Sequence, residues 1–323
     1  MEKILTYLKK HKLGNKYCIV TDDKVEKLYG LPLKRYLEKN GIECELISFL
    51  NGEKSKNLST VEMLAEKLIE KNFNRKDALI AVGGGVVGDV TGFLASIYMR
   101  GIPYIQVPTT LLAMVDSSIG GKTGVDLKSG KNLIGTFCQP AEIFVDTKLL
   151  KSLSQAQIKT GLAEIIKCAV IKDKKLFEFI EQNIKKILSG SEKEMNKIIA
   201  RTIEIKKEVV KSDEKENDQR IVLNYGHTFG HAIEKLSNYK ILHGHAVAIG
   251  MVLENRLAVE KKFLSSRDSE RIKNLLIKAG LPVATIKNPK LSDIKNDKKR
   301  DGNFIKMAMP TTIGKTKIYK LPI

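Results

Sequence analysis

Residues 77–93 read DALIAVGGGVVGDVTGF, an apolar strand pattern that runs into three consecutive glycines and then into a helical pattern. Gly83, Gly85 and Gly88 satisfy GxGxxG at this strand-to-helix turn. Glycine lets the backbone approach a diphosphate there, and the N-terminus of the helix favours negative charge. The stretch therefore predicts a nucleotide-binding α/β fold. The plain alternative is a tight turn that needs glycine for steric reasons alone.

The residues that follow differ from the ordinary dinucleotide fingerprint. A Rossmann fold places an acidic residue about 20 positions later, at the end of the next strand. Here that region reads VPTT (107–110), so recognition of the ribose has to come from elsewhere. The candidates are Asp22 and Asp23 after the first strand pattern, and Glu53 and Lys56 in GEKSK.

On both sides of this stretch, strand patterns alternate with helical ones through the first half of the chain. The strand patterns lie at 17–21, 43–49, 77–82, 104–108 and 142–145. They read as buried on both faces, which predicts a mainly parallel sheet. Beyond Ser152 the pattern becomes helical, at about 155–170, 174–188, 192–212, 225–237, 245–262 and 266–279, with extended segments in NFIKMAMP and TKIYKL. We therefore expect an α/β domain over 1–151 and a mostly helical domain over 152–323.

Length and composition limit the class of protein. The 323 residues exceed one ordinary core, and 42% hydrophobic with 29% charged residues exclude a disordered, fibrous or membrane protein. The N-terminus lacks a signal-peptide pattern and the four cysteines lack metal or disulfide spacing, so we expect a cytoplasmic protein with reduced thiols. The net charge of +19 is compatible with a nucleic-acid partner, an anionic small molecule or only a lysine-rich composition, and the scattered lysines favour solvated helix faces. We expect neither a nucleic-acid nor a membrane partner.

One glycine-rich segment fits neither a strand nor a helix. Residues 115–135 read VDSSIGGKTGVDLKSGKNLIG, with five glycines, and we expect a long loop without regular structure. Such loops are usually functional. Asp116, Lys122, Lys131 and Asn132 are candidates to enclose a phosphorylated or carboxylated ligand, and an ordinary surface loop is the alternative.

Four of the five histidines fall within residues 227–245. His227 and His231 are four apart and so share a helical face, the arrangement that metal-binding helices use. His243 and His245 follow after a short loop. We therefore predict a divalent metal, with Glu164 as a candidate carboxylate ligand, and keep structural histidines as the alternative.

Taken in order, several motifs resemble those of the 3-dehydroquinate synthase family of the shikimate pathway. They are GGGVVGD, YMRG, VPTTLLAMVDSSIGGKTGVD, GKNLIG, GLAEIIK, LNYGHTFGHAIE, LHGHAVAIGM and DKKRDG. The resemblance implies an N-terminal nucleotide-binding α/β lobe with a mainly parallel sheet, a mostly α-helical C-terminal lobe and a homodimer. It also implies a role in aromatic amino acid biosynthesis.

The implied enzyme is a lyase that uses NAD and a divalent metal, zinc in most members and cobalt as a possible substitute. It converts 3-deoxy-D-arabino-heptulosonate 7-phosphate to 3-dehydroquinate and phosphate. The steps are transient oxidation by NAD, β-elimination of phosphate, reduction and an intramolecular aldol closure.

The resemblance also assigns residues. As metal ligands it implies Glu164, His227 and His243, which moves His231 from the metal to the substrate phosphate and proton transfer. The substrate carboxylate falls to Lys206 and Arg220, and the phosphate to Lys122, Asn224, His231 and Lys298. Arg100 is expected to reach the phosphate of a neighbouring subunit, and Asp116, Lys131, Asn132 and Lys167 complete the substrate contacts. The implied NAD contacts are Asp22, Glu53, Lys56, Gly84, Gly85, Asp89, Thr109, Thr110, Lys122 and Lys131.

The chain departs from the family pattern at two places. His245 stands where the family usually has an acidic residue, and the first strand pattern comes as early as Tyr17, so we expect the opening strands to be missing. Two related activities remain as alternatives: a cyclase of the 2-deoxy-scyllo-inosose synthase type and a metal-dependent polyol dehydrogenase. Lys206 and Arg220 favour a substrate with a carboxylate over that of the related cyclase, whereas accumulation of NADH during turnover would indicate the dehydrogenase.

Overall fold

The computed structural model describes residues 1–216, 219–285, 289, 300–301 and 304–322. The chain divides into two compact units, an N-terminal unit, Met1–Ser152, and a C-terminal unit, Leu153–Ile323. None of the helices in the described ranges has the length and apolar character that a membrane crossing requires.

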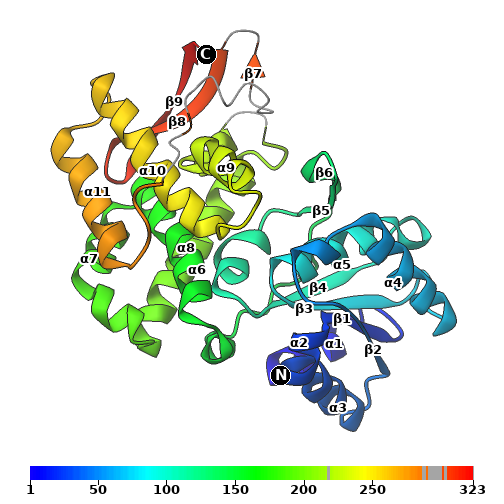
Figure 1. Ribbon diagram of the computed structural model, residues 1–323. Coiled ribbons are helices and arrows are strands. Elements are labelled where there is room, and N and C mark those ends of the chain that lie inside the picture. Colours follow the sequence, from blue (N-terminus) through cyan, green and yellow to red (C-terminus); the bar gives the residue numbers. More distant parts are fainter. Residues whose placement is uncertain (217–218, 286–288, 290–299, 302–303, 323) are drawn as a thin grey trace. The chain divides into compact units, whose positions relative to one another are not determined.

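A four-stranded parallel sheet in the order β2-β1-β3-β4 forms the centre of the N-terminal unit (Figure 1). Its strands are β1 (Tyr17–Asp22), β2 (Cys44–Phe49), β3 (Ala78–Gly83) and β4 (Tyr104–Pro108). β1 and β3 are buried along their whole length, as expected for apolar runs covered on both faces. Four of the five predicted strands are therefore confirmed.

Helices cover both faces of this sheet because alternate residues of each strand point to opposite sides. Ala78, Ile80 and Val82 of β3 pack with α1 and α3, whereas Leu79 and Ala81 pack with α4 and α5. The N-terminal unit contains α1 (Glu2–His11), α2 (Asp23–Val25), η1 (Glu26–Gly30), α3 (Leu31–Lys39), η2 (Glu53–Ser55), α4 (Leu58–Glu70), α5 (Gly85–Ile97), η3 (Tyr98–Arg100), η4 (Ala113–Ser117) and η5 (Thr147–Ser152). α1 was not among the elements expected from the sequence.

The strand order creates a switch point between β1 and β3. From β1 the chain moves outward to β2, and it then returns to β3 on the other side of β1. Open α/β sheets bind ligands at the carboxyl ends of the strands at such a point. Here those ends are Asp22 and Gly83, so the topology places the three-glycine turn where a nucleotide site is expected.

The prediction of a strand at 142–145 is wrong. Only one isolated parallel bridge forms, between Gln106 and Ile143, with two backbone hydrogen bonds of 2.9 and 2.8 Å. The chain touches β4 briefly and then turns into η5. Residues 142–145 are half-buried or exposed, so the segment lacks the covered face that would extend the pairing.

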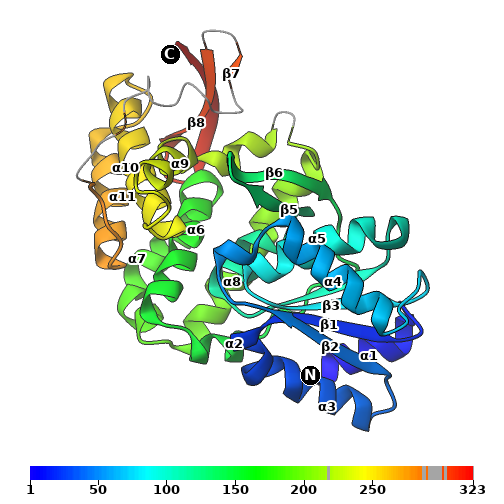
Figure 2. The same ribbon diagram turned by 45° about the vertical axis from the view of Figure 1, so that its right-hand side comes forward.

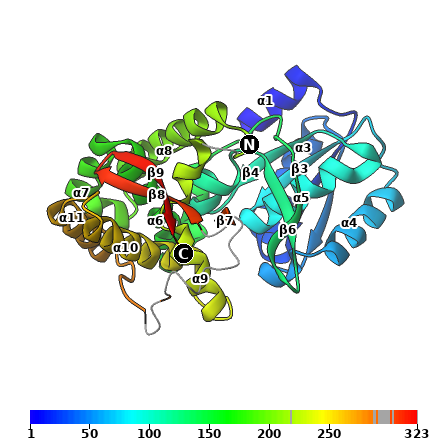
Figure 3. The same ribbon diagram turned by 90° about the horizontal axis from the view of Figure 1, so that it is seen from above.

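The expectation of an irregular loop over 115–135 is also wrong. After η4 the chain forms an antiparallel hairpin of β5 (Lys122–Leu127) and β6 (Gly130–Phe137), which lies beside α5 (Figure 3). Gly124 and Gly135 face each other across it, and a Cβ on Gly135 would lie 2.1 Å from the carbonyl oxygen of Thr123. The glycines that hide the strand pattern in the sequence are therefore what the hairpin requires.

The C-terminal unit is mostly helical, and α10 packs against both α6 and α9 (Figure 2). Its elements are α6 (Gln155–Lys172), α7 (Lys174–Leu188), α8 (Glu192–Ser212), η6 (Gln219–Asn224), α9 (His227–Leu236), α10 (His243–Glu260), α11 (Ser266–Lys278), β7 (Arg300–Asp301), β8 (Phe304–Thr312) and β9 (Lys315–Pro322). All six predicted helices and both extended segments are present.

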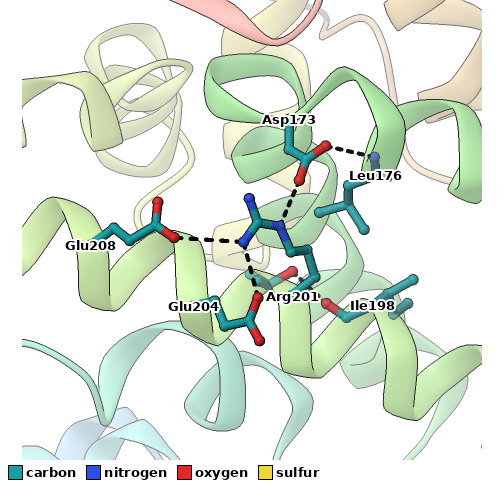
Figure 4. Close-up of polar contacts among 7 residues, drawn as sticks. Asp173, Leu176, Ile198, Arg201, Glu204 and Glu208 are labelled. Atoms are coloured by element: carbon teal, nitrogen blue, oxygen red, sulfur yellow. Dashed lines mark hydrogen bonds and ion pairs between the residues drawn. The ribbon is translucent and has the colours of Figure 1, made fainter.

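The start of α7 is fixed by a carboxylate. Asp173 caps α7 by accepting a hydrogen bond from the backbone N–H of Leu176 (2.9 Å), and it also accepts one from Nε of Arg201 on α8 (2.6 Å). Figure 4 shows Arg201 turned toward Asp173 and toward Glu204 and Glu208 of its own helix. This cluster joins α7 to α8, and α7 contributes none of the residues that the sequence analysis assigned to a site.

Candidate functional site

Three helices of the C-terminal unit bring one carboxylate and two imidazoles together. Glu164 lies in the middle of α6, and His227 and His243 are the first residues of α9 and α10. Oε1 of Glu164 lies 3.6 Å from Nε2 of each histidine. Two ligand atoms about 2.1 Å from a tetrahedral zinc ion lie about 3.4 Å apart. The three atoms therefore have the spacing of metal ligands.

Glycines on α10 allow this convergence. A Cβ on Gly244 would lie 2.3 Å from the carbonyl oxygen of Thr160, one turn before Glu164 on α6. A Cβ on Gly250 would lie 1.9 Å from the carbonyl oxygen of Gly226, just before α9. Backbone-to-backbone contact at both places sets how close the three ligand-bearing residues can come, and any larger residue would push the helices apart.

The outward-facing nitrogen of each imidazole is already engaged. Nδ1 of His227 lies 3.2 Å from the carbonyl oxygen of Tyr225, which can only accept, so Nδ1 carries the proton. Nδ1 of His243 lies 3.4 Å from Oε1 of Glu234. Both rings therefore present Nε2 to Glu164, and such outer partners are usual for metal-binding histidines.

Glu164 itself is fully buried, and Lys167 is its closest cation, with Nζ 2.5 Å from Oε2. Neither oxygen of Glu164 accepts a hydrogen bond of ordinary geometry from the described residues. Burial raises the pKa of this carboxyl, but Lys167 and His243 outweigh burial and lower the pKa to about 2. A divalent cation would satisfy Oε1, which faces the two imidazoles, so the residues present fit a metal.

The electrostatics at His243 also favour a cation. Burial lowers the pKa of this imidazole, but Glu164 and Glu234 on its two sides raise the pKa to about 10. Two carboxylates thus stabilise positive charge at the point where the ligand atoms meet.

His231 lies one turn beyond His227 on α9 and is exposed. Its ring centroid is 5.4 Å from that of His227 and 6.3 Å from that of His243. With Glu234 and His243 it forms a second group of close ligand atoms, which shares His243 with the first. His231 is therefore beside the first group and outside it. The helical spacing that paired His227 with His231 identified neighbours on one helix, whereas the other two candidate ligands, Glu164 and His243, come from α6 and α10.

Buried cations gather on three elements that contact one another, α6, α8 and η6. Lys167, Lys206 and Arg220 are 1%, 5% and 3% exposed. Lys167 pairs with Glu164, and Arg220 donates to the carbonyl oxygen of Glu214. Together the three cations concentrate positive charge on these elements. This part of the C-terminal unit is therefore suited to an anionic ligand.

The segment before α9 is held by its own acidic residues. The backbone N–H of Arg220 donates to Oδ2 of Asp213 (3.1 Å), and Nη1 of Arg220 donates to the carbonyl oxygen of Glu214 (2.5 Å). Nδ2 of Asn224 donates to Oε1 of Glu216 (2.8 Å). These bonds give Arg220 and Asn224 defined positions.

In the N-terminal unit, the three-glycine turn leads directly into α5. A Cβ on Gly84 would lie 3.1 Å from Cγ2 of Thr110, and one on Gly85 would lie 3.0 Å from Oγ of Ser117. The hydroxyls of Ser117 and Ser118 are buried and have no hydrogen-bond partner among the described residues. Orphaned hydroxyls beside the N-terminus of α5 fit the diphosphate of a dinucleotide.

A second cluster in this unit joins η2, α5 and the β5–β6 hairpin. Nζ of Lys56 lies 2.5 Å from Oδ2 of Asp89 and 2.5 Å from Oδ1 of Asn132. Lys131 pairs with Glu53 at 2.8 Å. Burial lowers the pKa of Lys56, but Asp89, Glu53 and other carboxylates raise it above its usual value, so the ammonium stays charged. Five predicted residues thus come together.

The remaining predicted residues are more dispersed. Oδ1 of Asp22 caps α2 by accepting hydrogen bonds from the backbone N–H groups of Lys24 and Val25. Thr109 is buried directly after β4. Lys122 is exposed at the start of β5. Asp116 is half-buried in η4. Lys298 lies outside the described residues.

Sequence reasoning missed several groups that the structure brings to these sites: Asp126, Ser117, Glu234 and Glu254. Oδ1 of Asp126 accepts from the backbone N–H of Asn132 (2.8 Å). Glu234 is seven residues after His227, on the same helical face, so spacing could have identified it. No local pattern pointed to Ser117 or Glu254.

Comparisons with known proteins agree over nearly the whole chain. Family models described as 3-dehydroquinate synthase N-terminal and 3-dehydroquinate synthase C-terminal match residues 46–160 and 161–300. The chain is 47% identical over 322 residues to the 3-dehydroquinate synthase of Thermodesulfovibrio yellowstonii, and the match covers 98% of this chain and 89% of that protein.

Two solved structures are also similar. The 2-epi-5-epi-valiolone synthase of Streptomyces hygroscopicus subsp. jinggangensis, with NAD⁺ and Zn²⁺ bound, matches with a TM-score of 0.91 and 28% identity over 99% of this chain and 91% of that chain. A 2-deoxy-scyllo-inosose synthase complexed with carbaglucose-6-phosphate, NAD⁺ and Co²⁺ matches with a TM-score of 0.89 and 30% identity over the same shares.

Proposed function

The chain belongs to the 3-dehydroquinate synthase family, and from this premise we propose that it converts 3-deoxy-D-arabino-heptulosonate 7-phosphate to 3-dehydroquinate and phosphate. The observation that carries the proposal is the group Glu164, His227 and His243, which lies in the same unit as three buried cations. A metal group and buried cations together suit a substrate with hydroxyls, a carboxylate and a phosphate.

We propose two cofactors. A divalent metal, zinc or cobalt, is held by Glu164, His227 and His243 of the domain 152–323, and NAD is held by the domain 1–151. Once bound, the metal polarises the hydroxyl to be oxidised, and NAD accepts and later returns a hydride. Oε1 of Glu164, which has no hydrogen-bond donor among the described residues, and the orphaned hydroxyl of Ser117 support these assignments.

The protein's own groups chiefly bind, orient and move protons in this proposal. Lys206 and Arg220 hold the substrate carboxylate, and His231 and Asn224 with Lys122 and Lys298 hold the phosphate. His231 is also proposed to move a proton, because its exposed imidazole lies one turn beyond His227 on α9. Lys167 steadies Glu164, to which it is paired.

The proposed NAD contacts follow the two clusters of the N-terminal unit. Gly84, Gly85, Thr109 and Thr110 surround the start of α5 and take the diphosphate. Lys56, with Asp89 and Glu53, belongs to the cluster that also contains Lys131 and Asn132. Asp22 is the candidate at the end of β1.

The reaction is tested by incubating the purified protein with the heptulosonate phosphate, NAD and zinc or cobalt. We expect phosphate and dehydroquinate in equal amounts and no build-up of NADH, because the hydride is returned in each turnover. Accumulating NADH would instead indicate a polyol dehydrogenase. Turnover of a phosphorylated sugar without a carboxylate, in place of the heptulosonate phosphate, would indicate a cyclase of the 2-deoxy-scyllo-inosose synthase type.

We also propose that the enzyme acts as a homodimer in which Arg100 reaches the partner's site. Arg100 is exposed on a turn where Met99 and Arg100 have positive φ values of 48° and 71°. Such backbone strain is concentrated at functional positions. Ile97, Met99 and Phe137, near this turn, are 47%, 41% and 50% exposed, as in an interface patch.

Mixing two inactive variants tests this arrangement. Arg100→Ala and His227→Ala, refolded together in equal amounts, are expected to recover about a quarter of the unaltered activity, because half the dimers then contain one intact site of two. Recovery of no activity from verified mixed dimers would place Arg100 in its own subunit's site. Arg35→Ala, an exposed arginine on α3, is the control and should keep full activity.

A cytoplasmic location is part of the proposal. All four cysteines are free, although Cys18 and Cys44 lie on the adjacent strands β1 and β2. Unbridged thiols are usual in a reducing compartment.

A further inference from the structure

The turn that leads into α9 is held by two adjacent residues from the middle of α10. The backbone N–H of Gly226 donates to Oε2 of Glu254 (2.7 Å), and the N–H of Thr228 donates to Oε1 of Glu254 (3.2 Å). The hydroxyl of Tyr225 donates to Oδ1 of Asn255 (2.6 Å). Glu254 is 0% exposed and Asn255 is 1% exposed, so these bonds are shielded from water.

This arrangement replaces an ordinary helix cap. The first N–H groups of a helix lack partners within the helix, and a local Ser, Thr, Asp or Asn usually supplies one. Here Gly226 occupies the N-cap position with a φ of 80° and has no side chain to offer. Glu254 provides the acceptor from another helix, and the positive end of the α9 dipole favours its charge.

Burial of a carboxylate away from water is costly unless its oxygens are bonded. The reaction proposed above gives Glu254 no part. Both oxygens of Glu254 are bonded here, and position 226 cannot carry a capping side chain, because a Cβ there would lie 2.6 Å from Cγ of Met251 and 2.9 Å from the carbonyl oxygen of Val247. Glu254 therefore supplies the bonds that a local residue cannot supply at this turn.

These bonds also act on His227, which lies between the two bonded N–H groups. The N–H of Gly226 belongs to the same peptide as the carbonyl oxygen of Tyr225, and the N–H of Thr228 belongs to the peptide that follows His227, so these two peptides are tied to α10. The carbonyl oxygen of Tyr225, whose ring is anchored by Asn255, accepts from Nδ1 of His227. The ring is thereby turned so that Nε2 lies 3.6 Å from Glu164.

We infer that Glu254 is a positioning residue that holds His227 in place as a metal ligand. The helix that begins with His243 also fixes the imidazole of His227, so α10 provides one ligand and orients another. This inference rests on the proposed function, because it assumes that His227 binds a metal.

The test compares Glu254→Ala with a matched control, Asp173→Ala. Asp173 is also a carboxylate that caps a helix in the same unit, but its helix, α7, contributes nothing to either group of candidate metal ligands. Both changes remove a cap and should lower thermal stability. Only Glu254→Ala should disturb the metal.

The measurement is the affinity for Zn²⁺ and Co²⁺, determined by competition with a coloured chelator, together with the absorption spectrum of the Co²⁺ form. We expect Glu254→Ala to bind about 10- to 100-fold more weakly, the usual effect of losing an outer partner of a ligand. Its Co²⁺ spectrum should also change. Asp173→Ala should bind within about twofold of the unaltered protein, with an unchanged spectrum.

Equal metal affinities and spectra in Glu254→Ala and Asp173→Ala would overturn the inference.

If Glu254→Ala does not fold, Glu254→Gln provides the test, because glutamine keeps the size and one acceptor oxygen but turns an NH₂ group toward the second N–H. Weaker binding with a changed Co²⁺ spectrum in Glu254→Gln would support the role, and unchanged values would refute it. If the unaltered protein bound neither ion, the proposed function itself would fail, whereas normal binding by both the unaltered protein and Glu254→Ala would remove only the positioning role.

Discussion

Alanine in place of His227 is expected to abolish metal binding and turnover together. The change removes one of three proposed ligands and leaves the buried carboxylate of Glu164 facing one imidazole. Loss of a ligand should weaken Zn²⁺ or Co²⁺ binding by more than the roughly 10- to 100-fold that outer partners are worth. Metal polarisation contributes several kcal/mol and about 1.4 kcal/mol corresponds to a factor of ten, so turnover should fall by about 10³-fold or more.

Substitutions of two other histidines serve as controls for this experiment. His231→Ala should retain the metal but lower turnover, since His231 lies outside the first ligand group. His11→Ala should change neither, because His11 is an exposed residue that stacks on Tyr7 in the N-terminal unit. Metal content is measured by elemental analysis after dialysis, alongside the rate of phosphate release. Full metal occupancy in His227→Ala would refute the ligand assignment.

Alanine at Lys206 or at Arg220 is expected to weaken capture of the substrate. Both side chains are buried cations on elements that contact each other, α8 and η6. A hydrogen bond to a charged group contributes about 1.5–3 kcal/mol, so kcat/KM should fall about 10- to 150-fold for each change. Most of the effect should appear in KM, because the carboxylate is bound but does not react.

The exposed neighbour Lys207 provides the control for Lys206. Lys207→Ala removes the same charge from the same helix, α8, but from its solvent face, so kcat/KM should stay within about twofold. Arg220→Ala also loses the bond to Glu214, and its thermal stability is therefore measured with its kinetics. If Lys206→Ala and Arg220→Ala kept the KM of the unaltered enzyme, the carboxylate assignment would be wrong. A substrate without a carboxylate would then become the better reading.

Local sequence patterns were enough to predict much of the fold. The predicted ranges 104–108, 174–188 and 192–212 coincide with β4, α7 and α8. In these segments the apolar residues repeat with the period of the element and are buried in it, so the sequence carries the information directly. The segment 142–145 resembled a strand for the same reason, but a single bridge to β4 formed in place of a ladder.

The β5–β6 hairpin was hidden because its pairing depends on glycine. Strand prediction relies on β-branched and aromatic residues, and glycine lowers that signal. Gly124 and Gly135 are nevertheless required, since the two strands approach too closely for a Cβ. The glycine-rich composition of the segment therefore predicted a loop, but the segment packs as a hairpin. In this hairpin Asn132 contacts Lys56 and Lys131 contacts Glu53.

The sequence by itself determined the parallel α/β unit, the helical unit, the glycine turn and, through its motifs, the family. The family motifs implied Glu164, His227 and His243 as ligands, but residue spacing could not show which histidines meet a carboxylate, because spacing along one helix describes only that helix. The tertiary structure decided this, since Gly244 and Gly250 let α10 rest on the backbones of α6 and the turn before α9. The same contact brought Glu254 to the start of α9. Contacts between elements that are far apart in the sequence depend on the shapes of both packed surfaces, so a pattern within one element does not predict them.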